Sequence, residues 1–227
     1  MINTILFDFD GVIADSLESS FKWFEHAALV FNIKLPVKTA EELKENFVEP
    51  FPELYSNLGF QWKRDRDEIF REYISYHTKN PAILVGGIEA VIKKLAGIPF
   101  LKLGIVSSNE QTILDENLKC HNLAKYFDIV IGVDRELNIP LKPDPTILLM
   151  ALDKLGASPS NSVYIGDQPS DMLTARNASE IMSNGSMKTI AITTGFASRQ
   201  KLEESNPRAD FIVDHPSEII PSLNLVS

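Results

Sequence analysis

Two carboxylates near the start of the chain are the residues best suited to chemistry. Asp8 and Asp10 follow the apolar run Ile5-Leu6-Phe7, and Gly11 after them can adopt a tight turn. In an extended segment this spacing points both side chains to the same side, at the end of a strand where open α/β sheets bind ligands. Crowded carboxylates need a counter-ion, and hard oxygen ligands suit Mg²⁺. A single acid would commonly be a turn or cap residue, but the pair indicates a metal site.

Three further polar groups follow later apolar runs. Gly166-Asp167 is joined by Asp171, although Asp171 could equally serve only as a helix cap. Ser107-Ser108-Asn109 ends one run and opens a helix, so it could offer a hydroxyl and free backbone N–H groups to an anion. Lys142 is a lone cation in a loop, where most lysines are merely solvated. Each signal is weak alone, but together, at the ends of successive strands, they indicate one composite site.

The elements that must position these residues are short apolar runs alternating with amphipathic segments. The runs are continuous and rich in β-branched residues, as in strands buried on both faces of a parallel sheet. Besides residues 5–7, the predicted strands are 103–106, 127–133, 162–165, 189–193 and 211–213. Helices are predicted over 112–119, from an Asp144 N-cap with Pro145 at the first helical position to Gly156, and from Ser170 onward. The alternation predicts a doubly wound α/β fold, with a long polar loop over 179–187.

The segment 15–85 breaks this alternation. It contains both tryptophans and many of the other aromatic residues, and it shows no convincing strand. Residues 16–31 and 65–77 carry apolar side chains three and four positions apart, which is typical of amphipathic helices. We therefore predict an α/β core domain formed by residues 1–14 and 86–227, with an inserted all-helical domain at 15–85. Cations of the insert that could reach a substrate are Lys22, Lys44, Lys63, Arg64 and Arg71.

Composition narrows the class of protein. The 227 residues are 44% hydrophobic and 23% charged, which is a globular profile, and the formal charge is −9. That balance argues against nucleic acid or anionic membranes as partners. Cys120 is the single cysteine, so no internal disulfide can form, and we expect it to be a buried apolar residue. No signal peptide or spanning segment is evident, so a cytoplasmic protein is expected.

The four polar groups, taken in order, resemble the four motifs of the haloacid dehalogenase (HAD) superfamily over nearly the whole chain. Asp8-Phe9-Asp10-Gly11-Val12 resembles the first motif, Ser107 the second, Lys142 the third, and Gly166-Asp167 with Asp171 the fourth. Ser107 stands where the family often has Thr, and the serine retains the hydroxyl group. The helical insert is similar to the C1 cap of the phosphoglycolate phosphatase and β-phosphoglucomutase branch, in which Asp-Ser commonly follows the first motif, as Asp15-Ser16 does here.

The resemblance implies Mg²⁺-dependent phosphoryl transfer through an aspartyl-phosphate. It also implies that the first strand lies between the strands carrying the second and fourth motifs. Asp8 would be the nucleophile and a metal ligand, and Asp10 the general acid/base with its backbone carbonyl on the metal. Asp167 would bind Mg²⁺, and Asp171 would complete the metal site or orient Lys142. Ser107 and the neighbouring Ser108 and Asn109 would hold the phosphate, which Lys142 would help to neutralise.

These expectations favour a phosphatase that acts on a small phosphorylated metabolite. A phosphomutase of the β-phosphoglucomutase type stays open, because it shares all four motifs and differs in whether water or a sugar hydroxyl accepts the phosphoryl group. A dehalogenase is disfavoured because the family's dehalogenases lack the acid that Asp10 supplies. A non-enzymatic phospho-receiver would be about half as long and would lack the insert, and a catalytically silent relative is disfavoured because every motif acid is present.

Overall fold

A single parallel sheet organises the core of the protein. The computed structural model describes residues 2–48, 51–133 and 139–223. Within these residues six strands pair in parallel in the order β3-β2-β1-β4-β5-β6. The strands are β1 (Thr4–Phe7), β2 (Lys102–Glu110), β3 (Ile129–Val133), β4 (Ser162–Gly166), β5 (Lys188–Ile192) and β6 (Phe211–Val213). The expected position of the first strand, between those carrying the second and fourth motifs, is confirmed.

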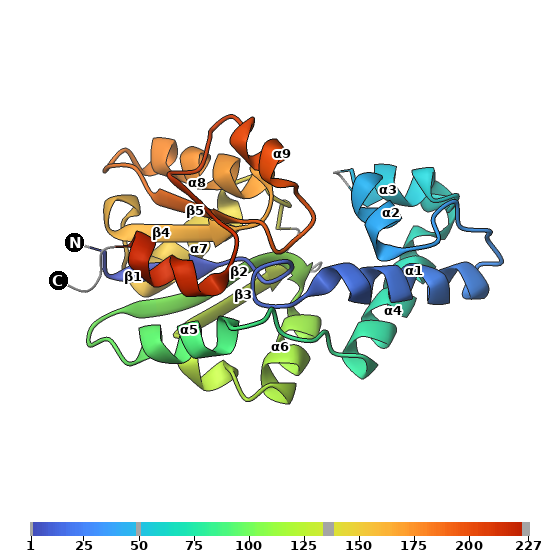
Figure 1. Cartoon of the computed structure of the whole chain (residues 1–227), viewed down its shortest axis with the longest axis horizontal. Coiled ribbons are helices and arrows are strands. Elements are labelled where there is room, and N and C mark those ends of the chain that lie inside the picture. Colours follow the sequence, from blue (N-terminus) through green and yellow to red (C-terminus); the bar gives the residue numbers. More distant parts are fainter. Residues whose placement is uncertain (1, 49–50, 134–138, 224–227) are drawn as a thin grey trace.

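Helices cover both faces of the sheet, so the strands are buried from two sides (Figure 1). Ile5 and Phe7 of β1 pack with the face covered by α5 (Ile88–Ala96), α6 (Gln111–Cys120) and α10 (Ile219–Ser222). Leu6 points to the opposite face, against α7 (Thr146–Leu155) and α8 (Pro169–Met182). Burial on both faces explains why the run 5–7 is continuously apolar rather than alternating. The predicted doubly wound α/β class is confirmed.

The inserted segment forms a helical body beside the sheet. Its helices are α1 (Ser16–Val30), α2 (Ala40–Glu45), α3 (Phe51–Asn57) and α4 (Trp62–Lys79), and Figure 1 shows them together at one side of the core. They surround a separate aromatic cluster, in which Trp23 is 1% exposed and donates a 2.8 Å hydrogen bond from Nε1 to the Tyr55 hydroxyl. The predicted 15–85 boundary of an inserted domain agrees with this arrangement but stays a prediction.

The chain enters and leaves the insert along adjacent segments. The backbone N–H of Asp15 donates to the Ile83 carbonyl at 2.8 Å, and the N–H of Val85 donates to the Ile13 carbonyl at 2.9 Å. An isolated antiparallel bridge joins Ala14 to Leu84 between them. The two connections therefore form a short paired neck that ties the start of α1 to the loop after β1.

Several local expectations change in the structure. Helix α7 begins at Thr146, one residue later than expected, so Pro145 lies at the N-cap position instead of Asp144. The Asp144 side chain accepts the Thr146 N–H at 2.9 Å. Helix α8 reaches Met182 and shortens the loop predicted over 179–187.

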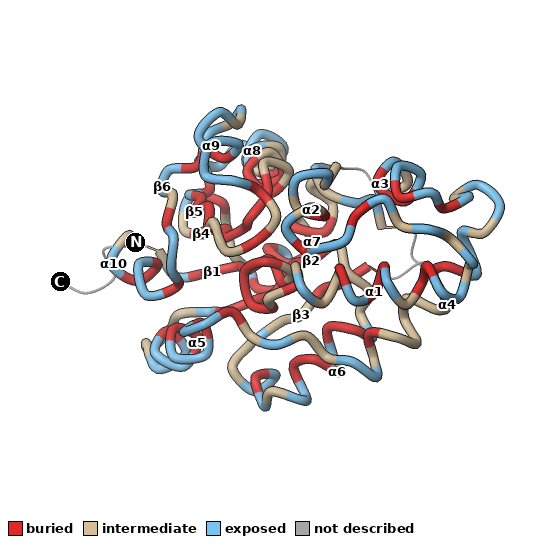
Figure 2. Tube along the Cα trace, turned by 45° about the vertical axis from the view of Figure 1, so that its right-hand side comes forward, coloured by how far each residue is buried: buried red, intermediate tan, exposed pale blue. Residues whose placement is uncertain are grey.

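Figure 2 shows how burial is distributed, with strand β1 buried and the outer sides of α5 and α6 exposed. The burial of one residue differs from the expectation. The prediction that Cys120 is buried is wrong, because its side chain is exposed. Cys120 is the last residue of α6. Among the described residues, no helix combines the length and apolar character needed to cross a membrane.

Candidate active site

The acids of the first and fourth motifs meet where the order of the strands reverses. Strand β1 lies between β2 and β4, and Phe7 pairs with Ile165 in the register of β1 and β4. Asp8 therefore emerges beside Asp167, and its N–H donates to the Ile165 carbonyl at 2.8 Å. The carboxyl ends of strands at such a switch point form the ligand-binding crevice of open α/β sheets.

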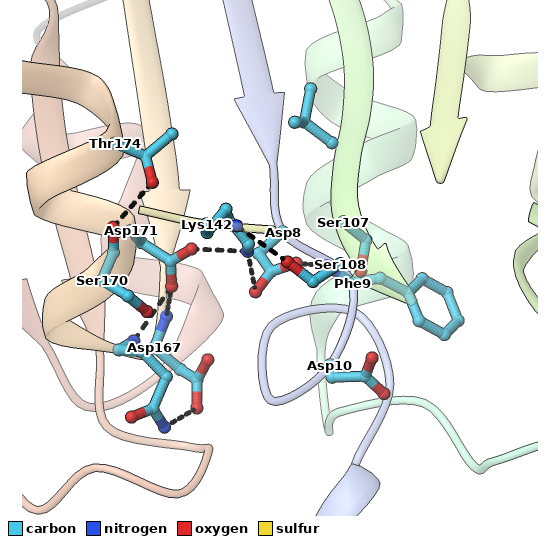
Figure 3. A network of polar contacts seen from close by, with 12 residues as sticks. Asp8, Phe9, Asp10, Ser107, Ser108, Lys142, Asp167, Ser170, Asp171 and Thr174 are labelled. Atoms are coloured by element: carbon cyan, nitrogen blue, oxygen red, sulfur yellow. Dashed lines mark hydrogen bonds and ion pairs between the residues drawn. The ribbon is translucent and has the colours of Figure 1, made fainter. Parts of the chain in front are cut away.

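Lys142 lies between two of these carboxylates (Figure 3). Its Nζ is 2.8 Å from Asp8 Oδ2 and 2.6 Å from Asp171 Oδ1. Its side chain is only 6% exposed, so it is not the solvated loop lysine that a cation at this place usually is. The Lys142 Nζ also donates to the Tyr164 hydroxyl at 3.2 Å, and that hydroxyl donates to the Val106 carbonyl at 2.9 Å. The cation is thus held in one position from three directions.

Asp171 uses both of its oxygens within the protein. Oδ1 accepts from Lys142, and Oδ2 accepts the backbone N–H groups of Asp167 at 3.1 Å and Gln168 at 3.0 Å. The second set is a capping interaction at the start of α8. Asp171 therefore both caps α8 and contacts Lys142, and its role at a metal site or in orienting Lys142 stays a prediction.

Asp167 is enclosed by the loop that follows β5. Its Oδ2 accepts the Phe196 backbone N–H at 2.8 Å and the Gln168 Nε2 at 2.9 Å. Two glycines make this approach feasible. A Cβ at Gly195 would overlap the Asp167 carboxylate, and Gly11, at φ +74°, would bring a Cβ within 2.6 Å of the same oxygen.

The electrostatics of this group call for additional positive charge. Asp8, Asp167 and Asp171 are buried, and one carboxylate oxygen of each lies within 4.8 Å of the others. Burial raises the pKa of Asp8 to about 7 despite the attraction of Lys142. Burial together with repulsion from Asp171 and Asp8 raises the pKa of Asp167 well above its usual value. For Lys142, burial alone would lower the pKa, but Asp171 and Asp8 outweigh it and raise the pKa. Three buried carboxyls, only two of which contact the single lysine, form an arrangement that a hard divalent cation fits.

Asp10 has different partners from Asp8, and its carboxylate lies apart from the lysine-centred group (Figure 3). Strand β1 ends at Phe7, and the chain then turns, so the extended geometry assumed for Asp8 and Asp10 is not maintained. Asp10 Oδ1 accepts from Ser16 Oγ at 2.6 Å, and Oδ2 accepts from Asn109 Nδ2 at 2.9 Å. Burial raises the Asp10 pKa, while these two hydrogen bonds lower it. The structure thus brings Ser16, the first residue of α1, to Asp10, the second acid of the first motif.

The Ser107-Ser108-Asn109 segment lies near the acids but does not open a helix, so that expectation is wrong. Strand β2 continues to Glu110, and α6 begins at Gln111. The register of β2 against β3 shifts between Val106 and Glu110, which places the irregularity at these three residues. Asn109 donates its backbone N–H to Ser107 Oγ at 3.2 Å and its side-chain amide to Asp10. The N–H of Asn109 therefore already has an acceptor.

A cavity of about 630 Å³ joins the strand ends to the insert. Its lining includes Asp8, Asp10 and Lys142 on one side and aromatic residues of the insert on the other. None of the five insert cations singled out in the sequence lines it, although Lys44 Nζ donates to the Gly195 carbonyl at 2.6 Å. Arg66, which the sequence did not single out, does line the cavity.

The doubly wound sheet and the acidic crevice at its switch point define an α/β protein with a ligand site at the strand ends, and comparison with known proteins identifies the family. The profile of the haloacid dehalogenase-like hydrolase family matches residues 5–182. The chain belongs to this family. The resemblance drawn from the four motifs and the predicted enzyme class, a hydrolase, are confirmed.

Individual relatives extend over the whole chain. Pyrophosphatase PpaX of Bacillus cereus is 28% identical over 227 residues, which covers 98% of this chain and 97% of the relative. A crystal structure described as a predicted phosphatase from Clostridium acetobutylicum covers 100% of both chains with a TM-score of 0.80 and 23% identity. A haloacid dehalogenase-like hydrolase from Streptococcus pneumoniae covers 98% of this chain and 99% of its own, with a TM-score of 0.79 and 22% identity. At these identities the two structures support the fold alone.

Proposed function

We propose that the protein is a Mg²⁺-dependent phosphatase that hydrolyses a small phosphomonoester through an aspartyl-phosphate. The observation that carries this proposal is the buried triad Asp8, Asp167 and Asp171 with Lys142 held between two of its members. The curated relative named a pyrophosphatase, at 28% identity, supports phosphate chemistry. The net charge of −9 favours a small metabolite over nucleic acid or an anionic membrane as the partner, and the cytoplasmic location stays a prediction.

The residues present fit Mg²⁺. The three carboxylates supply hard oxygen donors, and the raised pKa values of Asp8 and Asp167 indicate that Lys142 alone does not compensate them. Because Asp8 and Asp167 line the cavity and Asp171 does not, we assign metal binding chiefly to Asp8 and Asp167, with Asp171 orienting Lys142. The Asp10 backbone carbonyl remains a predicted further ligand. When bound, Mg²⁺ supplies positive charge that offsets the repulsion between the carboxylates and a phosphate dianion.

Asp8 is the proposed nucleophile. One of its carboxylate oxygens forms a bond to phosphorus while the ester P–O bond breaks, which gives an aspartyl-phosphate and an alkoxide. The Phe9 N–H, 2.7 Å from Asp8 Oδ1, fixes the rotamer of this carboxylate, and Lys142 holds Oδ2. Ser107, Ser108 and Lys142 line the cavity beside Asp8 and are the proposed contacts of the phosphate.

Asp10 is the proposed general acid/base. It donates a proton to the departing alkoxide and then accepts one from the water that attacks the aspartyl-phosphate, so Asp8 is released as a free carboxylate. A raised pKa lets Asp10 hold a proton more readily, as the first step requires. Ser16 and Asn109 clamp its two oxygens, and Asn109 thereby takes the role of a positioning residue rather than the predicted phosphate ligand.

Hydrolysis of pyrophosphate is the second candidate, because the curated relative carries that name. The mutase alternative lacks a specific observation in its favour. Both alternatives use the same strand-end residues, so the substrate rather than the site distinguishes them.

Phosphate release from a generic phosphomonoester tests the proposal. We expect turnover with Mg²⁺, none with EDTA, and none in the Asp8→Asn protein. Asp153→Asn, which changes an exposed acid of α7, is the matched control and should keep full activity. Full turnover in EDTA or in Asp8→Asn would refute the mechanism, and isomerisation of a sugar phosphate without net phosphate release would favour the mutase.

A further inference from the structure

The wall of the cavity opposite the acids is aromatic. It is contributed mainly by the insert, and several of its rings remain only half-buried within the protein alone. The Phe47 ring stacks on Phe196 of the core loop, with ring centroids 4.3 Å apart and an interplanar angle of 27°. Around these two rings the wall includes Trp23, Phe24, Tyr55, Trp62 and Tyr73. Partly exposed aromatic surface inside a cavity favours a ligand that covers it with an apolar group.

The charge of the lining disfavours a polyanion. Among the described lining residues, the cations are Arg66 and Lys142, while five carboxyls belong to Asp8, Asp10, Asp67, Glu110 and Asp167. Both cations already have acidic partners. Lys142 contacts Asp8 and Asp171, and Arg66 Nε lies 3.3 Å from Asp67 Oδ1. A single phosphate can be compensated by Lys142 and a metal. The second phosphate of pyrophosphate would face the aromatic wall, where the described lining residues offer no cation without an acidic partner.

The volume of the cavity also disfavours pyrophosphate as the substrate. A cavity of about 630 Å³ lies in the range that binds organic molecules of drug size, roughly 300–1,000 Å³. Pyrophosphate is much smaller than this cavity and would leave its aromatic half filled with water. A phosphomonoester whose alcohol carries a ring would place its phosphate at the acids and its ring on the wall.

From the aromatic wall, the charges and the volume we infer that the substrate is a phosphomonoester with an apolar, ring-bearing leaving group, and that pyrophosphate is a poor substrate. This inference rests on the proposed phosphatase function and specifies its substrate class. Phe47, Trp62 and Phe196 are the residues that determine the specificity, because their rings face the cavity and are not fully buried by the protein itself.

A matched pair of substrates tests the inference on the unmodified protein. 2-Phenylethyl phosphate and ethyl phosphate both release primary alkoxides of similar basicity, so their rates differ mainly through contacts with the ring. With Mg²⁺ present, we expect kcat/KM for the phenylethyl ester to exceed that for the ethyl ester at least about 10-fold. It should also exceed that for pyrophosphate, although pyrophosphate has the better leaving group.

Variants locate the preference. In Trp62→Leu and Phe47→Leu the ratio of the two kcat/KM values should fall towards one. Phe100→Leu is the control, because Phe100 is 95% exposed and lies outside the cavity lining, and the ratio should persist there. The inference would be overturned by any of three results: equal kcat/KM values for the two esters, a higher kcat/KM for pyrophosphate than for the phenylethyl ester, or an unchanged ratio in both wall variants. Absence of Mg²⁺-dependent hydrolysis of all three compounds would instead overturn the proposed function.

Discussion

His77 gives the helical insert a measurable sensitivity to acid. It lies on α4 and is 8% exposed, with its ring centroid 4.4 Å from that of Tyr73 and 5.9 Å from that of Trp23. Its Nε2 is buried and has no hydrogen-bond partner in the described part of the chain. Burial disfavours the charged imidazolium and lowers the pKa of His77 to about 4, from a usual value of 6.5.

The sign and size of the effect follow from that difference. Between about pH 4 and pH 6.5 the unfolded chain binds a proton at His77 that the folded protein does not bind, so acid favours unfolding. The contribution of the neutral histidine is fully present above 6.5 and is lost as the pH falls towards 4. Each pH unit within this window corresponds to about 1.36 kcal/mol, so acidification to about pH 5 costs roughly 2 kcal/mol of stability through this residue.

Urea unfolding of the protein and of His77→Phe at pH 7 and pH 5 measures this cost. The phenyl ring keeps the packing but cannot titrate, so the variant should lose about 2 kcal/mol less unfolding free energy than the native protein between the two pH values. Tyr76→Phe alters the same ring cluster without removing an imidazole and should retain the native pH dependence. If the native protein and His77→Phe lose equal amounts of stability, the burial argument for His77 is refuted.

Two further perturbations test the crevice. Gly195→Ala places a Cβ against the Asp167 carboxylate and should lower kcat/KM roughly 10–100-fold. In the control Gly86→Ala the Cβ would meet nothing within 4 Å, so kcat/KM should be unchanged. Equal activities of the two variants would show that the close approach of Gly195 to Asp167 is unimportant. Lys142→Met leaves Asp8 and Asp171 without their shared cation, so phosphate release should be lost and the unfolding free energy measured without Mg²⁺ should fall by about 3–5 kcal/mol. An unchanged unfolding free energy would mean that the buried ion pairs do not stabilise the fold.

The core of the fold was predictable because its physical signal is local. A strand buried on both faces must be continuously apolar, and residues 5–7 and 163–165 satisfy this without any knowledge of their partners. The positions of the acids then follow, since Asp8 and Asp167 come directly after β1 and β4, which are neighbours in the sheet. The helix predicted over 112–119 is present as Gln111–Cys120. The expectation that Ser107-Ser108-Asn109 opens it was wrong, because the backbone irregularity between Val106 and Glu110 has no signature in residue type.

Other parts of the site depend on contacts between distant segments. Nothing near Lys142 in the sequence indicates that it is buried between Asp8 and Asp171, because these partners come from the loop after β1 and from α8. The Phe196 N–H reaches Asp167 only because β5 lies next to β4 in the sheet. The Asp15-Ser16 pair did carry a signal through its family resemblance, but the 2.6 Å hydrogen bond from Ser16 to Asp10 gives it a physical reason.

Charge and apolar surface enter the cavity from different parts of the chain. The acids Asp8, Asp10 and Asp167 and the cation Lys142 come from the ends of strands and the loops of the core, whereas most of the aromatic rings come from the insert. Phosphoryl transfer therefore depends on short motifs that can be read from the sequence. Selection of the leaving group depends on rings brought together by the packing of helices, which no local pattern reveals. The name of a relative at 28% identity therefore gives no guide to the group that this chain's aromatic wall accepts.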